Sequence, residues 1–242
     1  MPAFVEKFRA GLRDIPATLG AQYETGLAAS PTHLSILAKL LAGSKITLCA
    51  QNSGTAKSGA FTGEVSPAVL KEVGCAMTLV GHSERRHVFK EDDLMIASRM
   101  RAALEEGLDV LLCVGEVLQD RKAGKTFKTI ETQLLILKQD LPASVWKHLL
   151  IAYEPVWAIG TGETATPQQA QEVHAFIRNW ILEKCSATEA PALRILYGGS
   201  VTPENSAAIM AQADVDGLLV GGASLDPAVF SSVIKSGLKS RT

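Results

Sequence analysis

The sequence lacks several features that mark whole classes of proteins. Its net charge is −1 over 242 residues, so it has no excess of basic charge to hold nucleic acid or an anionic membrane surface. No apolar run reaches the roughly 18 residues that a membrane helix needs. The first residues, MPAFVEKFRAGLRDI, have the pattern of an amphipathic helix and lack the apolar centre of a signal peptide. We therefore expect no nucleic-acid partner and no membrane attachment.

Cysteine is scarce, and its spacing excludes the usual paired motifs. The chain has four cysteines, Cys49, Cys75, Cys113 and Cys185, and none forms a C-x-x-C pair. Three of them lie in or beside apolar, strand-like runs. This pattern favours buried, reduced thiols over a disulfide framework or a zinc site. We therefore expect a cytoplasmic protein without a bound metal.

Short apolar runs alternate with helical patterns along the whole chain, which is 47% hydrophobic and 20% charged, as is ordinary for a globular protein. The predicted strands are 23–29, 45–51, 76–81, 109–115, 149–154, 193–198 and 217–221. After a first helix near Phe4, the predicted helices are 31–42, 66–73, 92–106, 126–141, 167–185, 203–212 and 226–236. Five begin with a polar residue before proline, as helices often do: Ser30-Pro31, Ser66-Pro67, Thr166-Pro167, Thr202-Pro203 and Asp226-Pro227.

Repeated strand–helix units of this kind predict a parallel sheet. A doubly wound open sheet and a closed (β/α)₈ barrel both fit the order, and barrels of this type have about 250 residues. Because the chain begins with a helix, we expect seven strands and eight helices, one strand short of a full barrel. No linker or change in composition divides the chain, so residues 1–242 are predicted to form a single domain.

Paired glycines follow the last two predicted strands, in YGGSV (197–201) and VGGAS (220–224). Glycine lets backbone N–H groups approach a ligand closely, and the start of a helix favours a phosphate. Each pair taken alone is explained as well by a tight turn. Two such pairs at neighbouring strand ends favour a phosphate site, because function in parallel α/β folds lies at the carboxyl ends of the strands.

His82 and Glu154 are the candidates for acid–base chemistry, since each stands where an apolar strand ends. A histidine in that position is often a structural residue, and a glutamate is often solvated or paired with a base such as Arg85 or Arg86. The segment that follows Glu154, PVWAIGTGETA (155–165), places bulky apolar residues before a Gly-Thr-Gly tip. That composition suits a lid that folds over a ligand, and it favours a catalytic role for both residues.

Several long motifs, in order, resemble the triosephosphate isomerase family from about Phe4 to the carboxyl terminus. They are AQNSGTAKSGAFTGEVS, GHSERR, CVGE, AYEPVWAIGTGETAT, YGGSV and GLLVGGASL. The resemblance implies a TIM (β/α)₈ barrel, a homodimer and no cofactor. It also implies a small phosphorylated triose as substrate, with dihydroxyacetone phosphate and glyceraldehyde 3-phosphate interconverted by proton transfer through an enediolate.

The resemblance also implies roles for individual residues. Glu154 corresponds to the family's catalytic base and His82 to its neutral imidazole, an established pairing in these enzymes rather than one derived from this chain. Glu84 corresponds to an acid near that histidine. The phosphate-binding positions are Gly160, Ser200, Gly221 and Gly222. The closing lid comprises Pro155, Val156, Trp157, Ala158, Ile159, Gly160, Thr161 and Gly162. Residues 53–64, with Thr62 near their end, correspond to the loop that reaches into the partner subunit.

The sequence departs from the family at its start. Family members open with a strand that ends in Asn-x-Lys, whereas only Met1, Pro2 and Ala3 precede the first helix here. We therefore expect an incomplete barrel without the catalytic lysine, weak or absent isomerase activity, and a weakened or unusual dimer. Two alternatives stay open. The protein could bind phosphate or sugar phosphate without catalysis, or the native chain could begin upstream of Met1.

Overall fold

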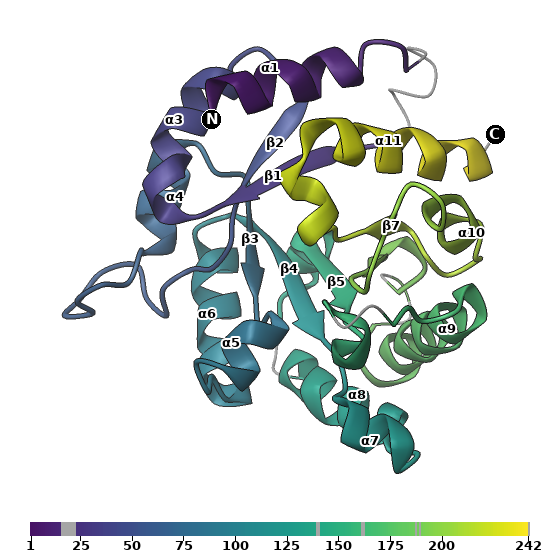
Figure 1. Cartoon of the computed structure of the whole chain (residues 1–242). Helices are drawn as coiled ribbons and strands as arrows, with labels where there is room; N and C mark the ends of the chain where they lie inside the picture. The colour runs from purple at the N-terminus through teal and green to yellow at the C-terminus, as the bar shows by residue number, and fades with distance from the viewer. Residues whose placement is uncertain (16–22, 139–140, 161–162, 187, 189, 242) are drawn as a thin grey trace.

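The computed structural model describes residues 1–15, 23–138, 141–160, 163–186, 188 and 190–241. One parallel sheet of seven strands runs through it in chain order and curls into an incomplete barrel with helices on its outer side (Figure 1). The strands are β1 (Thr25–Ala29), β2 (Ile46–Ala50), β3 (Met77–Val80), β4 (Asp109–Val114), β5 (Leu149–Tyr153), β6 (Arg194–Tyr197) and β7 (Gly217–Leu218). The predicted incomplete TIM barrel, with seven strands in sequence order, is confirmed.

Each of the eight predicted helical segments contains a helix, although the predicted helix 126–141 is α-helical only to Leu134 and its residues 139–140 lie outside the described residues. The helices are α1 (Pro2–Gly11), α3 (Pro31–Leu41), α4 (Pro67–Val73), α5 (Ser83–His87), α6 (Asp93–Glu105), α7 (Leu118–Lys122), α8 (Thr126–Leu134), α9 (Pro167–Lys184), α10 (Ser206–Met210) and α11 (Pro227–Leu238). Short 3₁₀ helices span Leu135–Lys138, Ala143–His148, Val156–Ala158, Ala190–Ala192, Gly222–Leu225 and Lys239–Arg241. The sequence analysis missed α5 and α7, because a helix of five residues is too short to show a period.

Most of the predicted helix starts are found where the polar residue and proline stand. The Ser66 hydroxyl accepts from the N–H of Val69, and Thr166 forms a capping box with Gln169. The start at Thr202-Pro203 is wrong, since α10 begins at Ser206. Residues 203–205 form a turn instead, in which the Asn205 side chain bonds the backbone of Ser200 and Thr202.

The last strand is shorter than the predicted 217–221. It ends at Leu218, although the N–H of Leu219 still donates to the Tyr197 carbonyl at 2.8 Å. Among the described residues β7 pairs only with β6, and β1 pairs only with β2. β7 forms two ladder pairs with β6, whereas β1, which also has a single neighbour, forms five with β2.

The core has two parts. The larger part lies between the strands and the surrounding helices, where Phe8 of α1 stacks on Phe230 of α11 with ring centroids 4.8 Å apart. The smaller part fills the barrel interior with Leu79, Leu111, Cys113, Leu150 and Ala152. Within the described ranges, the chain has no helix long and apolar enough to span a membrane.

Candidate active site

One cleft of about 780 Å³ at the carboxyl ends of the strands gathers the predicted catalytic and phosphate-binding residues. It collects them because parallel strands all end at the same rim of the sheet. The residues from the predicted set that line it are His82, Glu84, Glu154, Gly160, Ser200, Gly221 and Gly222. The sequence placed these residues in four separate segments, and the fold brings them to one site.

Glu154 follows β5 directly, and its side chain is only 2% exposed. Two groups of Ser83 bind its carboxylate: the backbone N–H donates to Oε2 at 2.9 Å, and the hydroxyl donates to Oε1 at 3.3 Å. His82 Nε2 lies 2.9 Å from Oε1. Three donors at one buried carboxylate hold it in a single orientation.

His82 follows β3 and caps the first turn of α5. Its Nδ1 accepts the backbone N–H of Glu84 at 3.3 Å, so in the neutral ring the proton lies on Nε2 and is donated to Glu154. Burial lowers the pKa of His82, but the hydrogen bond and charge of Glu154, with the charge of Glu84, outweigh it and leave the pKa raised. If Glu154 turns toward a ligand, the main raising contribution is lost, and burial favours the neutral ring.

The backbone around Glu154 is packed so tightly that glycine is needed beside it. A methyl group on Gly115, which follows β4, would overlap the Glu154 carbonyl oxygen. Gly115 is itself clamped by the Gln133 side chain, which accepts its N–H at 2.8 Å and donates to its carbonyl at 3.0 Å. A methyl group on Gly198 would lie 3.0 Å from Glu154 Cγ. These contacts fix the position of the Glu154 backbone and of its Cγ atom, from which the carboxylate extends.

Glu84 lies at the edge of the cleft and is mostly exposed, with a side-chain exposure of 75%. Its carboxylate oxygen is 3.9 Å from Nδ1 of His82. At that distance and exposure it acts on His82 mainly through its charge, which contributes to the raised pKa of the histidine. Its predicted role near the catalytic histidine stays a prediction.

The predicted lid begins with Pro155 and a 3₁₀ turn over Val156–Ala158, and Trp157 attaches this segment to the body. The indole N–H of Trp157 donates to Oε1 of Glu116 at 2.9 Å, and the Tyr153 hydroxyl donates to the same oxygen at 3.2 Å. Gly160, at the tip, has φ +67°, a conformation that favours glycine. The predicted lid residues Thr161 and Gly162 lie outside the described residues.

The sequence analysis missed two residues of this site. Glu116 is fully buried and bonded to Trp157 of the predicted lid; burial raises its pKa, against the hydrogen bonds from Trp157 and Tyr153. The sequence did contain an indication of Glu116, because it is the acidic residue at the end of the CVGE motif, shortly after an apolar strand. Ser83 lies within GHSERR, between the two residues that were singled out. A serine at this position is expected to begin a helix, and its residue type does not indicate that it also binds Glu154.

The predicted phosphate corner lies beside the carboxyl ends of β6 and β7. Ser200 is half-buried, whereas Gly221 and Gly222 are exposed. A methyl group added to either of these two glycines would meet no atom within 4 Å, so packing does not demand glycine there. By contrast, a methyl group on Gly199 would overlap the Tyr197 hydroxyl. The open glycines leave room for a ligand to reach their backbone N–H groups.

The comparisons with known proteins agree on one family. The family described as triosephosphate isomerase matches residues 3–237. Triosephosphate isomerase of Trichlorobacter lovleyi is 49% identical over 204 residues, which cover 84% of this chain and 81% of that protein. The enzyme of Paracoccidioides lutzii is 48% identical over 210 residues, covering 87% and 84%. A chloroplastic triosephosphate isomerase of Arabidopsis thaliana is 48% identical over 192 residues, covering 79% and 60%.

Proposed function

Because the chain belongs to the triosephosphate isomerase family, we propose that it interconverts dihydroxyacetone phosphate and glyceraldehyde 3-phosphate. The observation that carries this proposal is the contact between the Glu154 carboxylate and His82 Nε2, 2.9 Å apart in the cleft. A base and a hydrogen-bond donor side by side suit the transfer of a proton between two adjacent carbons that both carry oxygen.

The proposed reaction assigns one task to each residue. The carboxylate of Glu154 takes a proton from one carbon and returns it to the other, through an enediolate. The N–H of His82 donates to the substrate oxygens, on which negative charge develops. Ser200 and the N–H groups of Gly160, Gly221 and Gly222 bind the phosphate. Closure of the lid excludes water and protects the enediolate.

We propose that this activity is weak, because the cleft lacks a free cation. Among the described residues that line it, Arg85 carries the only ammonium or guanidinium group. Arg85 already donates to Glu91 and lies over the Phe89 ring, 4.2 Å from its centroid. Loss of a single preorganised donor typically lowers a rate by about 10²–10³. The same feature favours a second candidate function, a protein that binds sugar phosphate without catalysis.

A coupled isomerase assay, combined with a titration of 2-phosphoglycolate, separates the two functions. We expect slow turnover that 2-phosphoglycolate inhibits, with an inhibition constant equal to the dissociation constant measured by calorimetry. Binding without any turnover above that of Glu154→Gln would favour the non-catalytic function. Neither binding nor turnover by a folded protein would contradict both.

We also propose that the protein forms a homodimer, with the loop at 53–64 as the docking element. This loop projects from the body between β2 and α4 (Figure 1). Exposed apolar side chains lie on this loop, on the segment between α5 and α6, and on the first turn of α6: Phe61 by 48%, Val88 by 68%, Phe89 by 61% and Leu94 by 78%. Exposed apolar groups of this size favour association. Within the described residues β1 has a neighbour on one side only, and the docking surface beside it is correspondingly smaller, which is the reason to expect a weak dimer.

A cytoplasmic location completes the proposal. All four cysteines are free, and the cytosol keeps thiols reduced. Fractionation of cells that produce a tagged chain tests the location, and recovery of the protein in an organelle fraction would contradict it.

A further inference from the structure

Arg86 of α5 stands close to the proposed catalytic pair, although it does not line the cleft. Its side chain is only 9% exposed and bonds three acceptors from three segments. Nε donates to the Gly81 carbonyl at 2.8 Å, Nη2 to the Cys113 carbonyl at 3.1 Å, and Nη1 to Oδ1 of Asp93 at 2.7 Å. A guanidinium presents its donors in a rigid, planar fork, so it holds these acceptors in one arrangement.

These contacts fix the backbone on both sides of His82. Gly81 precedes His82, and its φ of +72° is a left-handed conformation that favours glycine and turns the chain away from β3. The carbonyl of His82 itself accepts the backbone N–H of Arg86 at 3.1 Å. The two peptide groups that flank the α-carbon of His82 are therefore both bonded to the same residue.

The bond to Cys113 extends this arrangement to the strand beside Glu154. The ladder between β3 and β4 stops one residue before Gly81 and Cys113, and the guanidinium joins their two carbonyls where the next rung would be. The carbonyl of Val114, the next residue along β4, accepts the backbone N–H of Glu154 at 2.8 Å. Arg86 is thus connected through β4 to the backbone of the proposed base.

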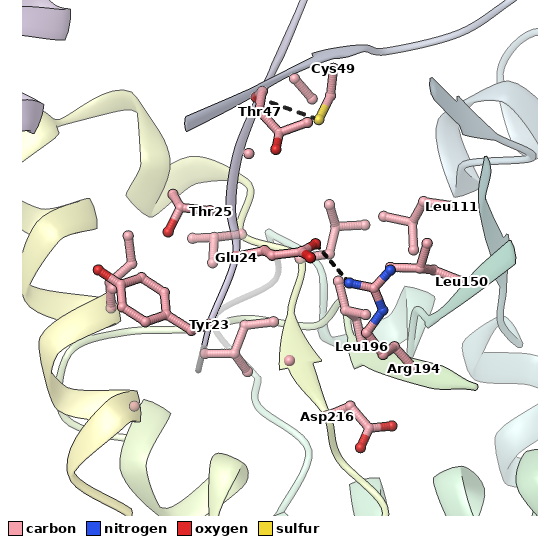
Figure 2. A pocket seen from close by; sticks show the side chains of 18 of the residues that line it. Tyr23, Glu24, Thr25, Thr47, Cys49, Leu111, Leu150, Arg194, Leu196 and Asp216 are labelled. Atoms are coloured by element: carbon pink, nitrogen blue, oxygen red, sulfur yellow. Dashed lines mark hydrogen bonds and ion pairs between the residues drawn. The ribbon is translucent and has the colours of Figure 1, made fainter. Parts of the chain in front are cut away.

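The pairing of β4 with β5 makes this connection stiff. The two strands are aligned over five register pairs, from Val110 with Leu149 to Val114 with Tyr153. Leu111 and Leu150 form one of these pairs, and both side chains lie in the barrel interior (Figure 2). Since paired strands move together, a shift of the β4 end is passed to the end of β5, where the proposed base follows.

We propose that Arg86 is a positioning residue that sets the distance between His82 and Glu154. It does so by bridging the ends of β3 and β4, while Asp93 holds its guanidinium in place. An arginine with a purely structural role would only join α5 to α6, and its loss would lower stability without moving the pair. The effect on turnover rests on the proposed isomerase function, whereas the effect on the geometry of the pair does not.

Arg86→Lys tests the proposal, because it keeps the charge and removes the fork. A misplacement of about 1 Å can lower a rate about 10²-fold, so kcat should fall about 10–10²-fold. KM should stay near the parent value, since Arg86 does not line the cleft. The matched control is Arg178→Lys on α9. Arg178 also donates to a carbonyl, that of Leu193 at 2.8 Å, and to a carboxylate, that of Asp214 at 2.8 Å. This control should lose stability and keep kcat.

The pKa of His82, measured from the ring nitrogen shifts by NMR, provides a readout that does not need turnover. Burial lowers this pKa, but the hydrogen bond and charge of Glu154, with the charge of Glu84, outweigh it. A wider separation weakens the contribution of Glu154. The pKa should therefore fall in Arg86→Lys, where no charge has been lost, and should keep its parent value in Arg178→Lys.

Two further variants apply where a lysine at position 86 prevents folding, which urea unfolding shows. Asp93→Asn leaves the guanidinium in place without its charged anchor, and it should lower kcat and the pKa of His82 in the same direction but by less. In Arg86→Ala, added guanidinium ion should restore part of the lost kcat. Methylammonium at the same concentration should not, because it cannot bond both carbonyls.

Parent values of kcat and of the His82 pKa in a folded Arg86→Lys protein would overturn the proposal. So would a lower kcat with an unchanged His82 pKa, since the pair would then be intact, and so would equal changes in Arg178→Lys. A parent protein without any turnover would contradict only the proposed isomerase function. In that case the His82 pKa in Arg86→Lys alone decides whether Arg86 positions the pair.

Discussion

The carboxylate of Glu154 is held by the backbone N–H of Ser83, which donates to Oε2 at 2.9 Å. This bond joins the end of β5 to the first turn of α5, and it aligns the side chain beside His82. The base of the proposed reaction is therefore positioned by a neighbour in the helix that His82 caps. A ligand that draws Glu154 into the cleft must compete with Ser83 for the carboxylate.

Glu154→Gln should reduce isomerase activity to the background of the assay, because an amide cannot accept the proton. The protein should stay folded, since glutamine has the same shape and still accepts from Ser83. Glu105→Gln, an exposed change on α6, is the matched control and should keep the parent rate. Coupled assays on freshly purified protein measure the isomerase rates of the parent and of both variants. Parent-like activity in Glu154→Gln would show that the base is wrongly assigned.

Trp157 and Glu116 should be energetically coupled. In a double-mutant cycle with Trp157→Phe and Glu116→Gln, urea unfolding should give a coupling free energy of about 0.5–3 kcal/mol, because the two side chains share a hydrogen bond. The control cycle uses a different tryptophan, Trp180, in place of Trp157. The indole N–H of Trp180 has no partner within the described part of the chain. Trp180→Phe and Glu116→Gln should be additive. Additivity in both cycles would show that the bond does not hold the lid.

His174 should make the protein lose stability in mild acid. It is fully buried, and burial lowers its pKa from 6.5 to about 4. Between these values the unfolded chain binds a proton that the folded chain does not, so this contribution is present above pH 6.5 and is lost as the pH falls toward 4. From pH 7.5 to 5, His174 should remove about 2 kcal/mol from the free energy of unfolding.

The control for this pH dependence is His174→Asn, whose amide can still donate to the Asp214 carbonyl that Nδ1 of His174 contacts at 3.2 Å. Urea unfolding of both proteins at pH 7.5 and pH 5 isolates the histidine from all other titrating groups. The parent should lose more stability than the variant. An equal loss in both would mean that His174 takes up its proton in the folded state as easily as in the unfolded chain.

Thr62→Arg should shift the protein toward monomer, because it adds a charge to the exposed docking loop. Sedimentation across a dilution series should show a dimer that dissociates more readily in the variant than in the parent. Ala123→Arg, an exposed change after α7, serves as the control and should leave the equilibrium unchanged. Identical sedimentation of Thr62→Arg and the parent would place any dimer contact on another surface.

A strand ending in Asn-x-Lys, joined in front of Met1, should raise kcat/KM by at least about 10², the scale on which single preorganised donors act. The control extension ends in Asn-x-Met, which fills the gap without the cation. A folded Lys extension that gains no more than the Met extension would show that the missing charge does not limit the rate.

The sequence alone determined much of this protein. Apolar runs without alternation predicted buried parallel strands, and the order of strands and helices predicted the curled sheet. The end of each run located His82, Glu154 and the paired glycines, because a strand end is visible where the apolar residues stop. The glycine and lid motifs carried the family resemblance, and local pattern was sufficient for these features.

Only the tertiary structure decided which side chains act on one another. Ser83 and Glu154 are 71 positions apart, and Glu116 and Trp157 are 41 apart. No local pattern reports such pairs, since their geometry depends on how neighbouring strands are aligned. The end of β7 has the same origin: residues 217–221 suit a strand, but the regular ladder with β6 stops at Leu218. Propensity is local, whereas a strand's length and a carboxylate's partners depend on what lies across the barrel.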